Sequence, residues 1–348
     1  MPKSLMISIV ILMLNSSLGR QTVKIKNLQH GQSPVVSVRF VSAGKCLLSA
    51  SFNGTLVLWD LQARKPLWRI DLDAGTRSED GRTISEILDM DVSLDGATIA
   101  MAYNRSQVIG NTLKGQSEHR IGLLDARDGK ELGTLTGHTA LIGTIAFSPD
   151  GRFLASGSSD LTARLWNLQT REEVLSIKLR GLARKVIFSP NGELLAIGVL
   201  SNGPWRPVVE LRVAQTGRLE REIEQGKANV SDIAFSPNGQ QLAVATHDEA
   251  GSQVELWNLR TALREHSYIE KSDINSIAFS PRGNLLALGG VIHGEGVVAL
   301  QSLKMETTAV AAKARAEVYN VSFSHDGNLL AAGTENGEIR LITTQLRR

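Results

Sequence analysis

The chain has 348 residues, of which 42% are hydrophobic, and it carries 32 glycines against 9 prolines. This composition is typical of a globular protein with many turns and excludes a disordered chain. The net charge is +3 and no run of five basic residues occurs, so the sequence gives no support for a nucleic-acid-binding patch. Cys46 is the single cysteine, which excludes an intrachain disulfide and a cysteine-based metal site.

The first 19 residues have the parts of a secretory signal peptide. Lys3 supplies a positive start, 5–14 is an apolar run, and 17–19 (Ser-Leu-Gly) offers small residues for cleavage. The run is about half of the ~20 residues needed to span a bilayer, so we expect no membrane span. The sequence thus predicts a signal peptide over 1–19 and an exported protein, periplasmic or secreted, of a bacterial type. A cytoplasmic location is the alternative.

The next segment, Thr22–Leu28, alternates as a half-buried strand does. A turn motif then recurs seven times. Each copy ends in a glycine that follows Phe or Val by four residues, and an apolar residue lies two positions before that Phe or Val. The glycines are Gly44, Gly96, Gly151, Gly192, Gly239, Gly283 and Gly327. This spacing predicts seven repeats of one supersecondary unit.

The third repeat shows the unit most clearly. Its strands are expected over 141–147, 153–158, 162–167 and 174–179, with tight turns between them. The turn 148–151, Ser-Pro-Asp-Gly, has residue types that close a hairpin.

This repeat resembles the WD-repeat family of β-propellers. Gly137-His138 resembles the family's Gly-His, and Trp166-Asn167 its Trp-Asp; Trp59-Asp60 and Trp257-Asn258 match as well. The resemblance implies an all-β fold over residues 20–348, a seven-bladed β-propeller of four-stranded antiparallel blades. The last repeat has only three strands, so Thr22–Leu28 would supply its outer strand and close the ring.

Four repeats depart from the family at the Trp position. Repeats 2, 4, 6 and 7 carry there Leu124, Val213, Ser302 or a neighbour, and Ile342. These blades lack the family's hydrogen-bonded tetrad, and we expect them to depend more on hydrophobic packing.

Ser156, His138 and Asp160 could be taken for a nucleophilic triad. The family resemblance implies instead that they form a structural tetrad with Trp166. A second set, His30, Ser49, Asn53 and Trp59, has nearly the same spacings. A catalytic triad has no reason to recur in another blade, and no Gly-x-Ser-x-Gly surrounds Ser156. We therefore predict no catalytic residue.

Insertions gather in the second-to-third-strand turns and in one inter-blade link, which emerge on the same face of a propeller. Long loops on a rigid scaffold are where binding usually occurs. The candidate partner-binding residues on this face are Arg105, Lys114, Trp205, Arg206, His247, Asp248, Glu249, His293 and Glu295. Trp and Arg are frequent at interface hot spots. The His, Asp and Glu residues repeat no metal-ligand spacing, so we predict neither a metal nor a cofactor.

These observations predict a non-enzymatic scaffold, a monomeric propeller that presents its looped face to a protein or peptide partner and binds no nucleic acid. The alternative is a metal-dependent, lactonase- or hydrolase-like propeller enzyme, or a small-ligand sensor, with its site over the central channel.

Overall fold

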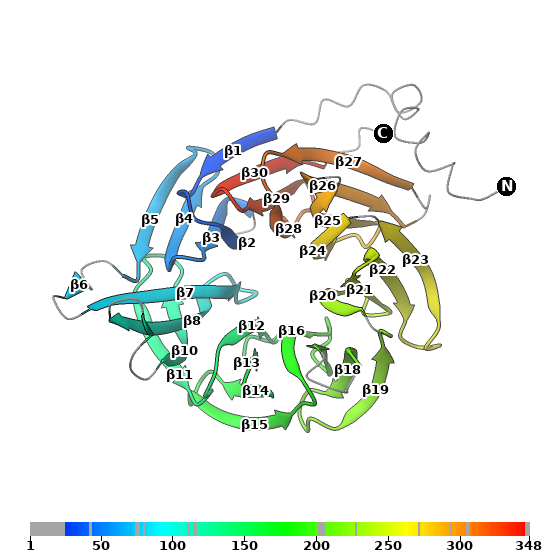
Figure 1. Ribbon diagram of the computed structural model, residues 1–348, viewed down its shortest axis with the longest axis horizontal. Helices are drawn as coiled ribbons and strands as arrows, with labels where there is room; N and C mark the ends of the chain where they lie inside the picture. Colours follow the sequence, from blue (N-terminus) through cyan, green and yellow to red (C-terminus); the bar gives the residue numbers. More distant parts are fainter. Residues whose placement is uncertain are drawn as a thin grey trace.

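The computed structural model describes residues 25–41, 44–73, 77–78, 81–109, 112–113, 117–200, 206–226, 228–270, 272–292, 294–303 and 307–344. These residues form seven antiparallel sheets arranged as blades around a central channel (Figure 1). The fold is the all-β, seven-bladed propeller that the repeats predict. No helix that could cross a membrane occurs among the described residues.

Each blade runs outward from the channel in the order of the chain. Blade 1 contains β2 (Val35–Val41), β3 (Cys46–Ser51), β4 (Thr55–Asp60) and β5 (Lys65–Asp71). Blade 2 contains β7 (Gly81–Val92), β8 (Thr98–Ile109), β10 (Glu118–Asp125) and β11 (Glu131–Thr136), with the short strands β6 (Arg77–Ser78) and β9 (Thr112–Leu113) at its margins. Blade 3 contains β12 (Ile142–Phe147), β13 (Phe153–Ser158), β14 (Thr162–Asn167) and β15 (Glu172–Lys178).

The second half of the ring repeats this order. Blade 4 contains β16 (Leu182–Phe188), β17 (Leu194–Leu200), β18 (Val208–Val213) and β19 (Leu219–Glu224). Blade 5 contains β20 (Asn229–Phe235), β21 (Gln241–Asp248), β22 (Gly251–Asn258) and β23 (Arg264–Glu270). Blade 6 contains β24 (Ser272–Phe279), β25 (Leu285–Ile292), β26 (Glu295–Ser302) and β27 (Thr307–Ala314). Blade 7 contains β28 (Val318–Phe323), β29 (Leu329–Thr334), β30 (Glu338–Thr343) and the N-terminal β1 (Ile25–Gln29).

The N-terminal strand closes the ring, as predicted. β1 pairs antiparallel with β30, from Ile25 opposite Ile342 to Gln29 opposite Glu338. The first three residues of the predicted strand, 22–24, lie outside the described residues. β1 and β30 come from opposite ends of the chain. Their pairing therefore completes blade 7 and closes the ring (Figure 1).

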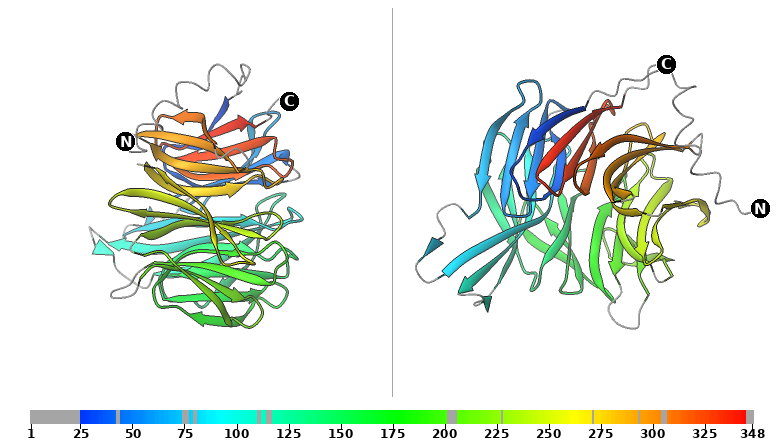
Figure 2. Two further views of the ribbon diagram at one scale, coloured as in Figure 1. Left: turned by 90° about the vertical axis from the view of Figure 1, so that its right-hand side faces the viewer. Right: turned by 45° about the horizontal axis from the view of Figure 1, so that its top comes forward.

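Blade 2 has the longest hairpin of the ring. β7 and β8 pair from Arg82 opposite Val108 to Val92 opposite Ile99, and they project beyond the neighbouring blades (Figure 2). The first residues of the insertion that follows Asn104 therefore continue strand β8 and lengthen its pairing with β7.

The inner strands carry a polar belt that the sequence analysis did not identify. Every inner strand contains a β-bulge, and the residue after the bulge is polar in all seven blades. These residues are Ser37, Asp89, Thr144, Lys185, Asp232, Ser276 and Asn320. Several accept a backbone N–H of the next blade; Asp232 Oδ2, for example, accepts from Ile277 N at 2.8 Å, and Asn320 Oδ1 from Val38 N at 3.0 Å. The belt thus satisfies backbone donors at the blade junctions, where strand pairing is not available.

The core lies between adjacent blades rather than within one layer. One buried cluster joins blade 2 to blade 3 and includes Ile121, Leu135, Ile145 and Trp166. Burial of such apolar side chains contributes roughly 25 cal/mol per Å². Small residues allow the sheets to approach closely: a Cβ atom on Gly157 of blade 3 would lie 2.6 Å from Cβ of Ala183 in blade 4.

Candidate functional site

The chain path gives the ring two different faces. The turns between first and second strands and between third and fourth strands emerge on one face, which we call the turn face. The second-to-third-strand turns and the inter-blade links emerge on the other, which we call the link face. The sequence predicted the binding surface on the link face.

The described link-face candidates lie in four blades. Arg206 and Glu249 are exposed, whereas Arg105 is half-buried in β8. His247 Nδ1 lies 3.0 Å from Asp273 Oδ1, Asp248 Oδ1 accepts from Ala250 N at 2.8 Å, and Glu295 pairs with Lys313. No hydrogen bond or ion pair of the described residues joins one candidate to another. Lys114, Trp205 and His293 lie outside the described residues.

Blade 3 contains a complete hydrogen-bonded network at the predicted tetrad. His138 Nδ1 lies 2.8 Å from Asp160 Oδ2, and His138 Nε2 lies 2.7 Å from Ser156 Oγ. Trp166 Nε1 donates to the same Ser156 hydroxyl at 2.8 Å. Although burial raises the pKa of Asp160, hydrogen bonds from Thr162 and His138 outweigh it and lower this pKa to about 2. Because Ser156 is fully buried (0% exposed), its hydroxyl cannot meet a substrate.

Blade 1 contains only part of this network. Ser49 Oγ lies 2.8 Å from His30 Nδ1 and accepts Trp59 Nε1–H at 2.8 Å. Asn53, predicted as the fourth member, is exposed and its Oδ1 accepts from Ser51 Oγ at 2.6 Å. Buried His30 Nε2 and Thr55 Oγ1 have no hydrogen-bond partner. Burial and the nearby charge of Arg69 lower the pKa of His30 to about 4.

Two other blades have a buried glutamate as the acceptor at this position. In blade 4, Arg212 lies opposite Leu195, as Trp166 lies opposite Leu154 in blade 3, so the equivalent residue is Arg212 and not Val213. Arg212 Nε donates to the buried Glu210 at 2.7 Å. In blade 5, Trp257 Nε1 donates to Glu255 Oε2 at 2.9 Å. The sequence prediction that Val213 takes the Trp position of blade 4 is therefore wrong, and a buried ion pair adds to the hydrophobic packing expected there.

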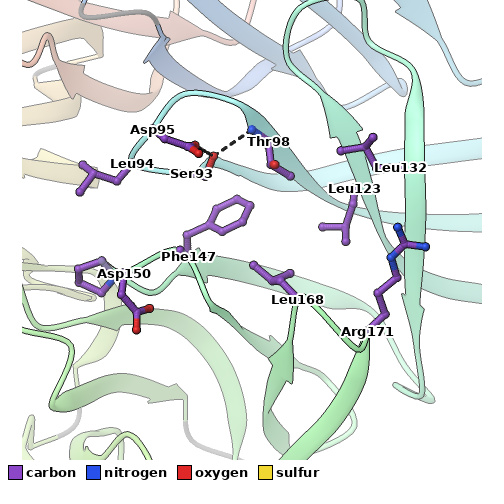
Figure 3. A pocket seen from close by; sticks show the side chains of 12 residues that line it. Ser93, Leu94, Asp95, Thr98, Leu123, Leu132, Phe147, Asp150, Leu168 and Arg171 are labelled. Carbon is purple, nitrogen blue, oxygen red and sulfur yellow. Dashed lines mark hydrogen bonds between the residues drawn. The ribbon is translucent and has the colours of Figure 1, made fainter.

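A groove opens between blades 2 and 3 on the turn face (Figure 3). Its volume is about 510 Å³, within the range of ~300–1,000 Å³ typical of binding pockets. Phe147, Leu123 and Leu168 line its apolar interior. Leu94 and Leu132 stand at its margins and are 73% and 41% exposed. The groove is thus a concave apolar surface in contact with solvent.

The groove lies where the first turn of blade 2 carries no proline. In blades 3 to 6 the second residue of the first turn is proline, and each proline packs on the turn glycine of the next blade. Cβ atoms placed on Gly192, Gly239, Gly283 and Gly327 would lie 3.6, 3.6, 3.4 and 3.2 Å from Cδ of Pro149, Pro190, Pro237 and Pro281. Blade 2 has Leu94 at this position, and nothing lies within 4 Å of a Cβ on Gly151. We call this the open seam.

Charged groups mark the two ends of the groove. Asp95 and Asp150 lie near Leu94, while Arg171 lies at the opposite end beside Leu132 and Leu168 (Figure 3). Hydrogen bonds from Ser93 and Ala97 lower the pKa of Asp95. Hydrogen bonds from Ser148 and Arg152 lower the pKa of Asp150 to about 2, although slight burial opposes them. Both carboxylates are therefore ionised at neutral pH.

The groove is formed by short turns and not by the long loops from which the binding surface was predicted. The signal was present in the turn motif, where Val92-Ser-Leu-Asp-Gly96 lacks the proline that four other repeats carry. Within the described part of the chain, no three His, Cys, Asp or Glu side chains gather as metal ligands do.

Family comparisons match the two repeats with the most complete networks. The model of the family "WD domain, G-beta repeat" matches residues 22–60 and 129–167. The model of the family "Eukaryotic translation initiation factor eIF2A" matches residues 211–342. The first family thus covers the repeats built around Trp59 and Trp166, and the second covers most of blades 4 to 7.

Several proteins, two of them with WD repeats in their names, are similar to part of the chain. The chain is 29% identical to WD repeat-containing protein SL1-17 of Schistosoma mansoni over 50% of this chain and 51% of that protein. It is 25% identical to the uncharacterized WD repeat-containing protein sll1491 of Synechocystis over 51% and 45%. It is 41% identical to eukaryotic translation initiation factor 3 subunit I of Aspergillus terreus over 41% and 36%. The chain therefore spans about half, or less, of these relatives' length.

Proposed function

The chain is a WD40-repeat propeller, and from this premise we propose that it is a non-enzymatic platform that docks a protein or peptide partner. WD40 propellers typically act as protein-interaction scaffolds. Initiation factor 3 subunit I, a relative over part of the chain, is by name a subunit of a larger assembly. The open seam is the observation that carries the proposal for this chain.

Leu94 is the most exposed apolar side chain of the groove. An exposed leucine beside a concave apolar surface is costly to leave in water, and full burial of a leucine side chain contributes about 1.5–3 kcal/mol. Leu132 adds a second exposed apolar side chain to the same groove. Apolar patches of this kind mark interaction sites on soluble proteins. A partner that covers Leu94 and Leu132 would gain this free energy without moving the rigid ring.

The lining chemistry favours binding over catalysis. The Ser93 hydroxyl donates to Asp95 at 2.6 Å and accepts Thr98 N–H at 2.9 Å, so both of its roles are occupied by the turn. The residues that line the groove include no histidine, cysteine or lysine. The groove therefore offers no Ser–His or Cys–His pair of the kind that acyl transfer uses.

Site-specific photocrosslinking tests the docking site. A photoreactive amino acid at Leu94, introduced in the native host, should capture one dominant protein. The same group at Leu263, a 65% exposed leucine between β22 and β23 of blade 5, is the matched control and should not capture it. Equal capture at both positions, or none at Leu94, would contradict docking at the seam.

We also propose that the protein is exported as a monomer, with cleavage after Gly19, and that it binds no nucleic acid. The composition of residues 1–19 supports export. N-terminal sequencing of the protein from fractionated cells tests it: a start at Arg20 in the envelope or medium is expected, and an intact Met1 in the cytosol would refute it.

A further inference from the structure

The first turns of blades 2 to 7 lie within the described residues and can be compared position by position. The third residue of the first turn is Asp95 in blade 2 and Asp150 in blade 3, and it is Asn191 and Asn238 in blades 4 and 5. These residues make the same turn: Ser93, Ser148, Ser189 and Ser236 donate to them at 2.6 to 2.7 Å. Since asparagine serves this geometry equally well, the two carboxylates beside the groove are not required by the fold.

The two carboxylates differ in how far they are neutralised. Asp150 Oδ2 accepts from Arg152 Nε at 2.6 Å, so its charge is largely compensated. Asp95 accepts from the Ser93 hydroxyl and from Ala97 N, and no cationic side chain pairs with it among the described residues. The end of the groove next to Leu94 is therefore negative.

The opposite end is positive. Arg171 is an exposed residue in the turn between β14 and β15, with φ of 61°. Its guanidinium lies over β11 of blade 2, because a Cβ on Gly133 would be 2.7 Å from Arg171 Nη1. No carboxylate pairs with this guanidinium in the part of the chain that the structure describes. The guanidinium of Arg171 is thus held at the groove beside Gly133, and its positive charge is not neutralised.

We propose that the open seam binds an extended peptide segment in which an apolar side chain lies between a basic and an acidic residue. This inference rests on the proposed docking function and adds the class of ligand. The apolar side chain would enter between Leu94 and Phe147, in the place that proline of the preceding blade takes in the seams that follow blades 3 to 6. The Lys or Arg would face Asp95 and the Asp or Glu would face Arg171, so the charges fix the direction of the segment.

The repeats themselves supply variants that should fold. Leu94→Pro installs the residue of blades 3 to 6 and should close the seam on Gly151. The turn already has their geometry, since Gly96 N donates to Ser93 O at 2.8 Å, as Gly192 N does to Ser189 O. Asp95→Asn installs the residue of blades 4 and 5 and removes only the charge. Asn191→Asp adds a carboxylate at another seam and is the matched control.

The experiment is selection of a random heptapeptide library against the full chain, with counter-selection on Leu94→Pro. Enriched peptides should carry Lys or Arg, a large apolar residue and Asp or Glu, in a fixed order. Fluorescence anisotropy with the synthetic peptide should show binding about tenfold weaker in Leu94→Pro. It should be about two- to fivefold weaker in Asp95→Asn and in Arg171→Gln, and unchanged in Asn191→Asp.

Two results would overturn the ligand class. The selected peptides could lack a charge preference, and their binding could be lost in Leu94→Pro but unaffected by Asp95→Asn. This result would refute the charged segment and leave docking at the seam intact. Failure to enrich any peptide that Leu94→Pro loses would refute a linear ligand; the crosslinking at Leu94 then decides separately whether a folded partner docks there.

Discussion

Blades 3 and 1 have the same four positions but different networks. In blade 3, Asp160 accepts from Thr162 Oγ1 at 2.6 Å and lies 2.8 Å from His138 Nδ1. Thr55 and His30 are the equivalent residues of blade 1, and their Oγ1 and Nε2 are the buried atoms without partners. One carboxylate therefore decides whether two buried polar groups are satisfied.

The difference follows from the number of acceptor sites. Asp160 accepts from Thr139 N, Thr162 N, Thr162 Oγ1 and the His138 ring. A carboxylate has two acceptor oxygens, whereas an amide has one and carries donors in place of the other. Asn53 cannot replace such an acceptor, and its Oδ1 takes the Ser51 hydroxyl instead.

The largest expected effect on stability comes from replacing Asp160 of blade 3 by the asparagine that blade 1 has at the equivalent position. Asp160→Asn should lower the free energy of unfolding by about 2–4 kcal/mol, because buried groups that lose a partner cost about 1–3 kcal/mol each. Denaturant unfolding of the full chain measures this. Asp150→Asn is the matched control, since Asp150 is exposed and blades 4 and 5 carry asparagine there; it should cause a much smaller change. Equal losses in the two variants would contradict the role of Asp160.

Lowering the pH should destabilise blade 1 more than blade 3, by a smaller free energy than the substitution Asp160→Asn costs. Burial and Arg69 lower the pKa of His30 to about 4 from its ordinary value of 6.5. The unfolded chain then binds the proton more readily, so stability present above pH 6.5 is lost as the pH falls towards 4. Between pH 7 and 5 the loss is about 2 kcal/mol. Burial also lowers the pKa of His138, but the hydrogen bond and charge of Asp160 oppose this.

Hydrogen exchange resolved by blade measures this difference. Amides of β3 and β4 should lose protection between pH 7 and 5, after correction for intrinsic exchange rates, while those of β13 and β14 change less. Loss of protection in blade 3 before blade 1 would show that His30 does not govern the acid response.

The sequence predicted the ring because its signals are local and repeated. Turn glycines and apolar alternation recur in each blade, and they indicate the number of blades and the closing strand without knowledge of side-chain contacts. The tetrad of blade 3 was predicted from the resemblance to the WD-repeat family. That resemblance did not show that Asn53 stays outside the network of blade 1, because an amide lacks the acceptors that a carboxylate has.

The groove could not be predicted by the same route. Pro149 of blade 3 packs on Gly192 of blade 4, whereas Leu94 of blade 2 makes no such contact with Gly151 of blade 3. Each of these pairs joins residues of two different blades. Only the packed ring shows that the proline of one turn covers the glycine of the next. Arg212 was missed for a related reason, since strand register in blade 4 decides which residue takes the place of Trp166.

The smallest expected effect is the reverse exchange, Asn53→Asp in blade 1. A carboxylate that turns inward would accept from Thr55 Oγ1 and from the His30 ring, and should raise the free energy of unfolding by about 1 kcal/mol at pH 7. It should also raise the pKa of His30 and so reduce the loss between pH 7 and 5. Thermal unfolding at both pH values measures the two effects together. A stabilised variant with unchanged acid sensitivity would mean that the new carboxylate pairs with Thr55 alone, and that the histidine of blade 1 is isolated by its ring orientation rather than by Asn53.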